Sequence, residues 1–419
     1  MKVVYDIFIQ LYPKLVALAA IFNPKAKKWI TGRKETWSRL NDFKTTQKNE
    51  PIVWIHCASL GEFEQGRPII ETIKHQHPNY NIAISFFSPS GYEVRKDYEF
   101  ADIVFYLPMD SPANARKLIE LLNPSLTIFV KYEYWFYYFR QIHAKKIPLI
   151  IASAVYRKQQ IFFKWYGSLY RNMLRYGSHF FVQDETSSYL LQQLIAKDKI
   201  SVSGDTRFDR VASLAKNHFP IPPIEAFCKN KKIIVAGSTW PTDDIILSDL
   251  ANSNNDIFFI IAPHDIHAKR LHQCLSTYKK AMRYSEYLNN STINQSVNCL
   301  IIDNVGLLSK LYYYATIAFI GGGFAGDGVH NVLEAATYGK PVLHGPIYDK
   351  YLEAIDLIEA GGAFVVTNQQ QLKEIASVLL NNENDYTQAS KSARKYIESK
   401  TGATQAIMQY IQENRLLTN

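Results

Sequence analysis

Cysteine is scarce in this sequence. The four cysteines, Cys57, Cys228, Cys274 and Cys299, form no C-x-x-C pair and follow no regular spacing. Their arrangement argues against a disulfide framework and against a cysteine-based zinc site, and it favours a reducing compartment. Motifs of the H-x-x-x-H and H-E-x-x-H kind are absent as well, so we expect no bound metal and no metal catalysis.

Acidic residues are fewer than basic ones. The chain has 47 Lys and Arg against 38 Asp and Glu, which gives a formal net charge of +9. A basic excess attracts an anionic partner, and nucleic acid, anionic lipid and a phosphorylated substrate all fit this charge. A content of 47% hydrophobic and 20% charged residues excludes a disordered chain, and 419 residues suffice for two domains of roughly 200 residues each.

One apolar run, Val3 to Phe22, approaches the length of a membrane span. It is interrupted at Asp6, Gln10, Pro13 and Lys14, and it is followed by Lys25, Lys27, Lys28, Arg33 and Lys34. No small-residue cleavage site follows, so we expect no removed signal peptide. An apolar helix followed by basic residues predicts a membrane anchor on anionic lipid over residues 1–48, which either spans the bilayer or lies in its interface. The alternative is an amphipathic helix that packs on the protein itself.

Short apolar runs alternate with helical stretches from Ile52 onward, which is typical of an α/β fold with a parallel sheet. The expected strands are 52–56, 81–87, 103–107, 126–130, 148–152 and 179–182 in the first half, and 232–236, 257–262, 299–303, 317–321 and 340–343 in the second. The segment FPIPPI at 219–224 predicts a linker, because its three prolines disfavour helix and central strand. We therefore expect two Rossmann-like domains, at 49–218 and 225–400, and a C-terminal helix within 401–419.

Polar residues follow two strands of the first half. Ser59, Gly61 and Glu62 come after strand 52–56, and Lys131 and Glu133 come after strand 126–130. Ligands of such folds bind at the carboxyl ends of strands. Gly61 would allow a sharp turn into the next helix, and Glu62 in its first turn could take a proton from an acceptor hydroxyl. Alternatively, Glu62 complements the helix dipole, and Lys131 and Glu133 form a surface ion pair.

Gly237, Ser238 and Thr239 follow the first strand of the second half. Backbone N–H groups and hydroxyls at a helix start bind phosphate well, although they also serve as simple helix caps. Pro263 and His264 end the strand 257–262, which favours substrate contact over an ordinary surface loop.

A glycine-rich segment follows strand 317–321. It contains Gly321, Gly322, Gly323 and Phe324, and then His330, Asn331 and Glu334. Glycines allow close approach to a ligand, a following helix would point its positive end at a phosphate, and Glu334 could accept hydrogen bonds from ribose hydroxyls. The spacing differs from the NAD fingerprint. A glycine loop with a purely structural role is the alternative.

Several motifs, taken in order, resemble the Kdo transferases, glycosyltransferases that build the inner core of lipopolysaccharide on lipid A. They are WIHCASLGEFEQGRPIIETI, FVKYEYW, FVQDETSSYLLQQL with SGDTRFD, GSTW, and GGGFAGDGVHNVLEAATYGKPVLHGP. The last block is the most specific single match, and the ordered set is more specific than any one block.

The resemblance implies a GT-B fold, with two Rossmann-like domains facing a cleft and a C-terminal helix within 401–419 that crosses back onto the first domain. It implies inverting transfer of Kdo from CMP-Kdo to a lipid A precursor, without a cofactor or metal, at the cytoplasmic face of the inner membrane. It makes Glu62 the catalytic base and Ser59, Gly61, Lys131 and Glu133 acceptor-binding residues. The expected nucleotide-sugar residues are Gly237, Ser238, Thr239, Pro263, His264, Gly322, Gly323, Phe324, His330, Asn331 and Glu334. The expected partners are lipid A precursor and an anionic membrane surface, and no nucleic acid.

The sequence departs from the family pattern at Pro263-His264-Asp265, where the family has Pro-Arg-His and the arginine would contact the nucleotide. Two other functions stay open on the sequence alone. One is a GT-B enzyme that uses a UDP-sugar and another lipid or cell-wall acceptor. The other is a non-catalytic protein of the same fold that binds the membrane surface.

Overall fold

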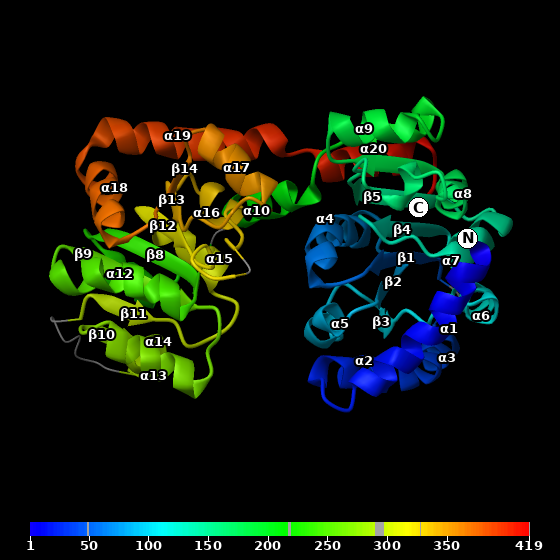
Figure 1. Ribbon diagram of the computed structural model, residues 1–419, viewed down its shortest axis with the longest axis horizontal. Helices are drawn as coiled ribbons and strands as arrows, with labels where there is room; N and C mark the ends of the chain where they lie inside the picture. Colours follow the sequence, from blue (N-terminus) through cyan, green and yellow to red (C-terminus); the bar gives the residue numbers. More distant parts are fainter. Residues whose placement is uncertain (48–49, 217–218, 290–296, 327, 419) are drawn as a thin grey trace. The chain divides into compact units, whose positions relative to one another are not determined.

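The computed structural model describes residues 1–47, 50–216, 219–289, 297–326 and 328–418. The chain forms two compact units (Figure 1). Unit 1 comprises Met1–Arg210 with Thr401–Asn419, and unit 2 comprises Val211–Lys400. The division falls within α10 (Thr206–Lys216), before the linker expected at 219–224. The last three residues of that segment belong to α11 (Pro222–Cys228), because the first turn of a helix accommodates proline. The domain boundaries expected at residues 48–49 and 218 lie outside the described residues.

A parallel sheet forms the centre of unit 1. Within the described residues its spatial order is β3 (Ile103–Tyr106), β2 (Asn81–Phe86), β1 (Ile52–Cys57), β4 (Leu126–Val130), β5 (Leu149–Ala154), β6 (His179–Val182) and β7 (Ile200–Val202). Strands β1 to β3 run outward on one side of β1, and the chain then returns to place β4 on its other side. The topological switch point therefore lies between β1 and β4, and ligands of such sheets bind at the carboxyl ends of these strands.

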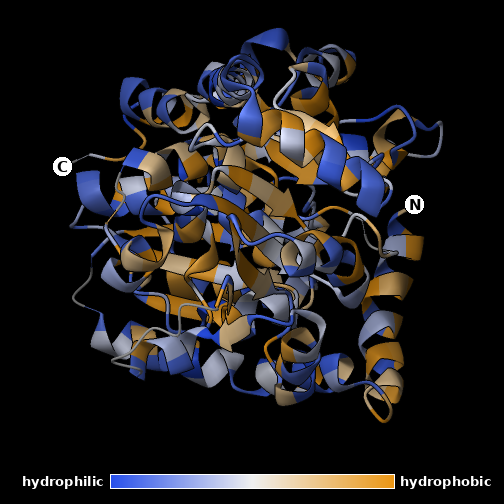
Figure 2. Cartoon of the chain, turned by 90° about the vertical axis from the view of Figure 1, so that its left-hand side faces the viewer, coloured by the Kyte–Doolittle hydropathy of each residue, from blue (hydrophilic) through white to orange (hydrophobic). Residues whose placement is uncertain are grey.

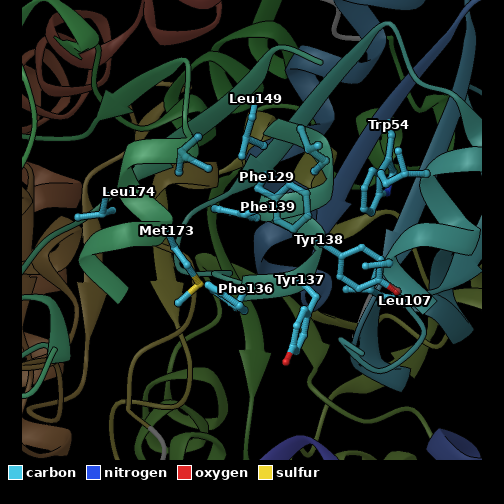
Figure 3. Close-up of a cluster of buried hydrophobic side chains, with 14 of the residues drawn as sticks. Trp54, Leu107, Phe129, Phe136, Tyr137, Tyr138, Phe139, Leu149, Met173 and Leu174 are labelled. Carbon is cyan, nitrogen blue, oxygen red and sulfur yellow. The ribbon is translucent and has the colours of Figure 1, made fainter. Parts of the chain in front are cut away.

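Helices cover both faces of this sheet, which explains why β1 is a continuous apolar run that is buried along its whole length. The helices of unit 1 are α1 (Lys2–Ala19), α2 (Pro24–Lys34), α3 (Thr36–Thr46), α4 (Leu60–Gln76), α5 (Pro89–Arg95), α6 (Pro112–Leu122), α7 (Phe136–Ala144), α8 (Ser168–Tyr176), α9 (Glu185–Gln192) and α20 (Ala403–Glu413), with 3-10 turns Ile161–Phe163 and Lys197–Lys199. One face packs on α1, α3, α6, α7, α8 and α9 (Figure 3), and the other packs on α4, α5 and α20.

The C-terminal helix α20 belongs to unit 1. Its Ile407 and Ile411 are buried in the apolar cluster that α4 and the sheet form. The Asp209 carboxylate accepts hydrogen bonds from the backbone N–H groups of Gly402 and Thr404, both at 2.6 Å, and so caps the start of the helix.

Unit 2 repeats the same plan. Within the described residues its parallel sheet has the order β10 (Ala281–Arg283), β11 (Cys299–Ile301), β9 (Ile257–Pro263), β8 (Lys232–Thr239), β12 (Ile317–Ile320), β13 (Val342–His344) and β14 (Ala363–Val365). Its helices are α11, α12 (Pro241–Ser253), α13 (Ala268–Thr277), α14 (Tyr284–Asn289), α15 (Leu308–Leu311), α16 (Leu333–Ala336), α17 (Leu352–Glu359), α18 (Gln369–Asn381) and α19 (Glu383–Lys400), with a 3-10 turn at Tyr312–Tyr314. The switch point of this sheet lies between β8 and β12. The two Rossmann-like domains predicted from the sequence are confirmed.

The N-terminal apolar run forms α1, which continues through Pro13. Tyr5 and Ile9 are buried, and the Tyr5 hydroxyl donates to the buried carboxylate of Asp110. Tyr5 also packs edge-on against Phe136 of α7. Among the described residues no helix is long and apolar enough to cross a membrane. The expected membrane anchor over residues 1–48 therefore stays a prediction.

Candidate functional site

Glu62 lies at the switch point of unit 1, in the first turn of α4 directly after β1. The Ser59 hydroxyl, at the N-cap position, donates a hydrogen bond to Glu62 Oε2. Ser59 is extended, with φ −142° and ψ −177°, so the chain turns there from strand to helix. Gly61 is helical, and a Cβ on it would meet Ser59 Oγ at 3.7 Å, an ordinary contact. The sharp turn predicted at Gly61 is therefore wrong, because Ser59 makes it.

Glu133 follows the neighbouring strand β4 and is held by two ring nitrogens. The Trp135 indole N–H donates to Glu133 Oε2 at 2.8 Å, and His56 Nε2 lies 3.5 Å from the same oxygen. His56 is fully buried in β1. The structure thus ties Glu133 to the sheet through His56 and to the following loop through Trp135.

Tyr132 lies within electrostatic range of several charged side chains at this edge of the sheet. Burial raises the pKa of its phenol, Arg157 and Arg207 oppose the rise, and Glu62 and Asp205 add to it. Lys131, at φ +70°, holds its ammonium 5.0 Å from the centre of the Tyr132 ring.

Arg207 itself is fixed by an ion pair of 2.8 Å with the buried Asp205. The edge therefore presents both carboxylates and guanidinium groups, a combination suited to binding sugar hydroxyls and anionic groups.

The corresponding turn of unit 2 is built on Asp243, a fully buried residue of α12. Its Oδ2 accepts the backbone N–H of Trp240 at 2.7 Å and that of Gly322 at 2.9 Å. One carboxylate thus joins Trp240 to the glycine loop after β12. Trp240 directly follows β8, whose last three residues are Gly237, Ser238 and Thr239 rather than the turn predicted after the strand. Ser238 adopts φ +54°, a left-handed conformation that is unfavourable for a serine and that the surrounding structure holds in place.

The glycine loop is packed too closely for side chains. A Cβ on Gly321 would lie 2.4 Å from the Ser238 carbonyl oxygen, and one on Gly323 would lie 2.6 Å from the backbone nitrogen of Gly345. Gly322 needs its residue type for another reason, since its φ is +91°. The structural role named as the alternative for these glycines is therefore real, and it leaves a ligand-binding role open.

Three rings form a stack beside this loop. His264 stacks on Trp240 at 4.6 Å and 21°, and on His330 at 4.7 Å and 16°. The Trp240 indole N–H donates to His330 Nε2 at 3.1 Å. The structure therefore brings together Thr239, Pro263, His264 and His330 of the predicted set, and adds Trp240 to them.

The helix expected after the glycine loop is short. Helix α16 has 4 residues, so its dipole is that of a single turn, and the expected attraction of a phosphate to its positive end stays a prediction. Asn331 caps this turn: its Oδ1 accepts from the Leu333 N–H at 3.1 Å, and its amide donates to Glu334 Oε1 at 3.2 Å. Phe324 packs against the apolar core of unit 2.

An arginine is present near the turn, although none stands in the Pro263-His264-Asp265 segment. Arg270 of α13 pairs with Asp244, and both side chains are buried. Its guanidinium also donates to the Thr239 carbonyl oxygen at 3.1 Å. Because the Arg270 side chain is buried in these contacts, it stabilises the end of β8.

The sequence motifs located Ser59, Glu62 and Glu133 but missed the residues that hold them. His56, Trp135, Asp243 and Arg270 were not singled out as site residues. For His56 a signal was available, since it is a polar residue inside an otherwise apolar strand at a switch point.

Residues 34–210 match the family model described as 3-deoxy-D-manno-octulosonic-acid transferase, or Kdo transferase. The chain is similar to the Kdo transferases. The 3-deoxy-D-manno-octulosonic acid transferase of Haemophilus influenzae is 25% identical over 373 residues, which cover 85% of each chain. That of Aquifex aeolicus is 27% identical over 363 residues, which cover 83% of this chain and 92% of the relative. These similarities indicate a glycosyltransferase, and the predicted resemblance to the Kdo transferases is confirmed.

A bifunctional glycosyltransferase/methyltransferase of Fusobacterium nucleatum is 26% identical over 394 residues, and the match covers 90% of this chain but 58% of the relative. Among solved structures, UDP-GlcNAc 2-epimerase from Neisseria meningitidis has a TM-score of 0.61 at 17% identity, covering 87% of this chain and 100% of its own. The same enzyme from Methanocaldococcus jannaschii has a TM-score of 0.51 at 15% identity, covering 83% and 98%. These neighbours share the fold of this chain, as expected for the GT-B architecture.

Proposed function

We propose that the chain transfers Kdo from CMP-Kdo to a lipid A precursor, with inversion and without a metal. The observation that carries the proposal is the placement of Glu62, a carboxylate at the switch point of unit 1 that the Ser59 hydroxyl orients. A carboxylate held in this position is placed to take a proton from a hydroxyl of a bound acceptor.

In the proposed reaction, Glu62 takes the proton from the 6′-hydroxyl of the lipid A disaccharide. The oxygen forms a bond to the anomeric carbon of Kdo from the face opposite CMP. The bond from that carbon to the phosphate oxygen breaks, CMP departs with the electron pair, and the configuration inverts. Lys131 and Glu133 orient the acceptor or the transferred sugar.

Unit 2 supplies the donor site in this proposal. Backbone N–H groups of Ser238, Thr239 and the glycine loop stabilise the charge that develops on the CMP phosphate, which is the task of preorganised donors in such reactions. The flat ring stack of Trp240, His264 and His330 offers a surface for a nucleobase. Glu334 accepts from ribose hydroxyls.

We also propose that α1 lies in the interface of an anionic membrane. Its outward side chains are exposed between 48% and 69%: Val3, Val4, Ile7, Phe8, Leu11, Leu15 and Leu18. Figure 2 shows this helix, next to the N-terminus, as a largely apolar ribbon. Lys25, Lys27 and Lys28 follow it in α2. An apolar helix face followed by basic residues suits a helix that lies flat on anionic lipid. Trp165, which is 90% exposed in the same unit, is an additional candidate for interfacial contact.

The transfer proposal is tested with purified protein, CMP-Kdo generated in situ, a tetraacyl lipid A precursor and EDTA. A Kdo-bearing product supports the donor, the acceptor and the metal-independent chemistry together. Product with a UDP-sugar but not with CMP-Kdo would instead identify the rival GT-B reaction. Binding to anionic vesicles with no transfer from any donor would leave a non-catalytic surface protein.

The membrane proposal is tested by co-sedimentation with vesicles that contain anionic phospholipid. Leu15→Glu in α1 is expected to weaken binding, because it places a charge on the apolar face. Val378→Glu is the matched control, since Val378 is 50% exposed on a helix of unit 2. Equal binding of wild type and Leu15→Glu would contradict the proposal.

A further inference from the structure

Three buried side chains with polar atoms, Trp54, His56 and Ser85, lie in the sheet on the side of Glu133 that faces His56. Trp54 and His56 alternate along β1 and therefore face the same side of the sheet. Ser85 of β2 pairs with His56 in the strand register. All three side chains are fully buried, and the His56 ring lies 4.8 Å from that of Phe129 on the other neighbouring strand. Figure 3 shows Trp54 and Phe129 in the apolar cluster that encloses this row.

The hydrogen bonds of Ser85 fix the proton on His56. The Trp54 indole N–H can only donate, and it donates to Ser85 Oγ at 2.8 Å. The Ser85 hydroxyl proton then needs an acceptor, and within the described residues His56 Nδ1, at 2.8 Å, is the remaining partner of that oxygen. A hydroxyl that donates to Nδ1 requires Nδ1 to be unprotonated. The proton of the neutral imidazole therefore sits on Nε2, the nitrogen 3.5 Å from Glu133 Oε2.

Two N–H groups consequently address one oxygen of Glu133. The Trp135 indole approaches Oε2 from the loop at 2.8 Å, and His56 Nε2 approaches it from the sheet. Trp135 makes a hydrogen bond, while His56 Nε2, which has no hydrogen-bond partner among the described residues, faces the same oxygen from the sheet, so both restrict the rotation of the Glu133 carboxylate.

We propose that His56 is a positioning residue, which the Trp54–Ser85–His56 chain of hydrogen bonds locks in its Nε2–H tautomer and which aims Glu133 at the acceptor. The assignment of the tautomer stands on the geometry alone. The effect on transfer rests on the proposed function, in which Glu133 contacts acceptor or sugar.

The tautomer is tested by two-bond ¹H–¹⁵N correlation spectra of the full chain labelled with ¹⁵N-histidine, with the His56 signals assigned through His56→Gln. The expected result is a neutral ring protonated on Nε2. Ser85→Ala removes only the hydroxyl and is expected to release the ring into a mixture of tautomers. A wild-type ring protonated on Nδ1, or on both nitrogens, at neutral pH would overturn the assignment.

The positioning role is tested by kinetics of three variants. His56→Met removes the N–H donor and is expected to lower kcat about 10–100-fold, the range found for outer-shell partners that orient a functional ligand. The KM for CMP-Kdo should not change, because unit 2 binds the donor. His56→Gln keeps an N–H donor near the position of Nε2 and is expected to recover most of the loss.

The chain contains a matched control. His179 of β6 is also buried in unit 1 and pairs with a serine, Ser201, at 2.8 Å through Nε2. His179→Met should lower stability without a selective loss of kcat. Equal losses of kcat in His56→Met and His179→Met, or no rescue by His56→Gln, would reduce His56 to a structural residue. If wild type transferred no Kdo at all, the proposed function would fail while the tautomer result stood.

Discussion

The two units share one plan and differ in what they place at the switch point. In unit 1 the strand ends carry Glu62 and Glu133, each partly exposed and each with a side-chain donor that orients it. In unit 2 the equivalent carboxylate, Asp243, is fully buried and spends one oxygen on two backbone N–H groups. The same topology thus places partly exposed carboxylates at the strand ends of one unit, and in the other a buried carboxylate that binds two backbone N–H groups, so a few residues after two strands differ while the fold stays the same.

The largest test of this contrast is Glu62→Ala. Loss of a general base is expected to lower turnover by about 10²–10⁴-fold, because that is the usual contribution of such proton transfer. Calorimetric binding of CMP should be unchanged, since unit 2 provides that site in our proposal. Both quantities are measured on the same preparation.

Glu64 provides the control for this experiment. It lies two residues further along α4 and pairs with Arg95 at 2.9 Å. Glu64→Ala should leave turnover close to that of wild type. Turnover near wild type in Glu62→Ala would disprove the assignment of the base, and a comparable loss in both variants would point to damage of α4.

The second contrast between the units is that one contains a buried ion pair and the other a partly exposed one. Arg270→Met in unit 2 leaves Asp244 buried without its cation, and breaking such a pair typically costs about 3–5 kcal/mol of unfolding free energy. Arg95→Met in unit 1 removes a pair in which both side chains are about one-third exposed, and should cost less than about 1 kcal/mol. Urea denaturation followed by tryptophan fluorescence measures both. Equal costs would mean that the buried pair contributes no more than a surface contact.

The sequence predicted the fold well because its signals are local. Apolar runs such as IVWIH and LTIFV are buried on both faces, so periodicity and length alone identify them as central strands. The edge strands β7, β10 and β14, of three residues each, were missed because such short segments gain their structure from pairing with a neighbour rather than from their own composition.

The candidate site was predicted less completely, and the reason is again physical. Glu62 and Glu133 follow strands and are visible as motifs. The contact between His56 and Glu133 joins residues on two strands that are far apart in the sequence, so no local pattern reports it. Likewise, the length of α16 could not be judged from sequence, because four residues carry no helical periodicity.

A third prediction concerns acid stability of unit 1. Burial lowers the pKa of His179 to about 4 from an ordinary 6.5, while Asp198 opposes and Lys199 adds to the shift. Below pH 6.5, His179 binds a proton in the unfolded chain but stays neutral in the folded protein. The unfolding free energy should therefore be unaffected above about pH 7 and fall between pH 6.5 and pH 4, by up to about 3 kcal/mol.

His179→Gln should remove this part of the acid sensitivity. Urea denaturation at a series of pH values measures the slope for both proteins. His344 of unit 2, whose pKa burial also lowers, stays in the variant, so a smaller slope should persist. Identical slopes in wild type and His179→Gln would contradict the prediction.

The smallest expected effect is a difference in stability between alanine variants of two glycines in the same loop, Gly323 and Gly326. Gly323→Ala places a Cβ 2.6 Å from the Gly345 nitrogen, and because that contact is backbone the loop must move, at a cost of about 1–3 kcal/mol. A Cβ on Gly326 would have nothing within 4 Å, so Gly326→Ala should be tolerated. CMP binding by calorimetry should weaken in Gly323→Ala only, while vesicle binding, which depends on unit 1, should stay the same in both. Equal weakening of CMP binding in the two variants would mean that the loop needs glycine for the close approach of a ligand rather than for its packing against Gly345. The difference between the two units would then rest on ligand contact alone.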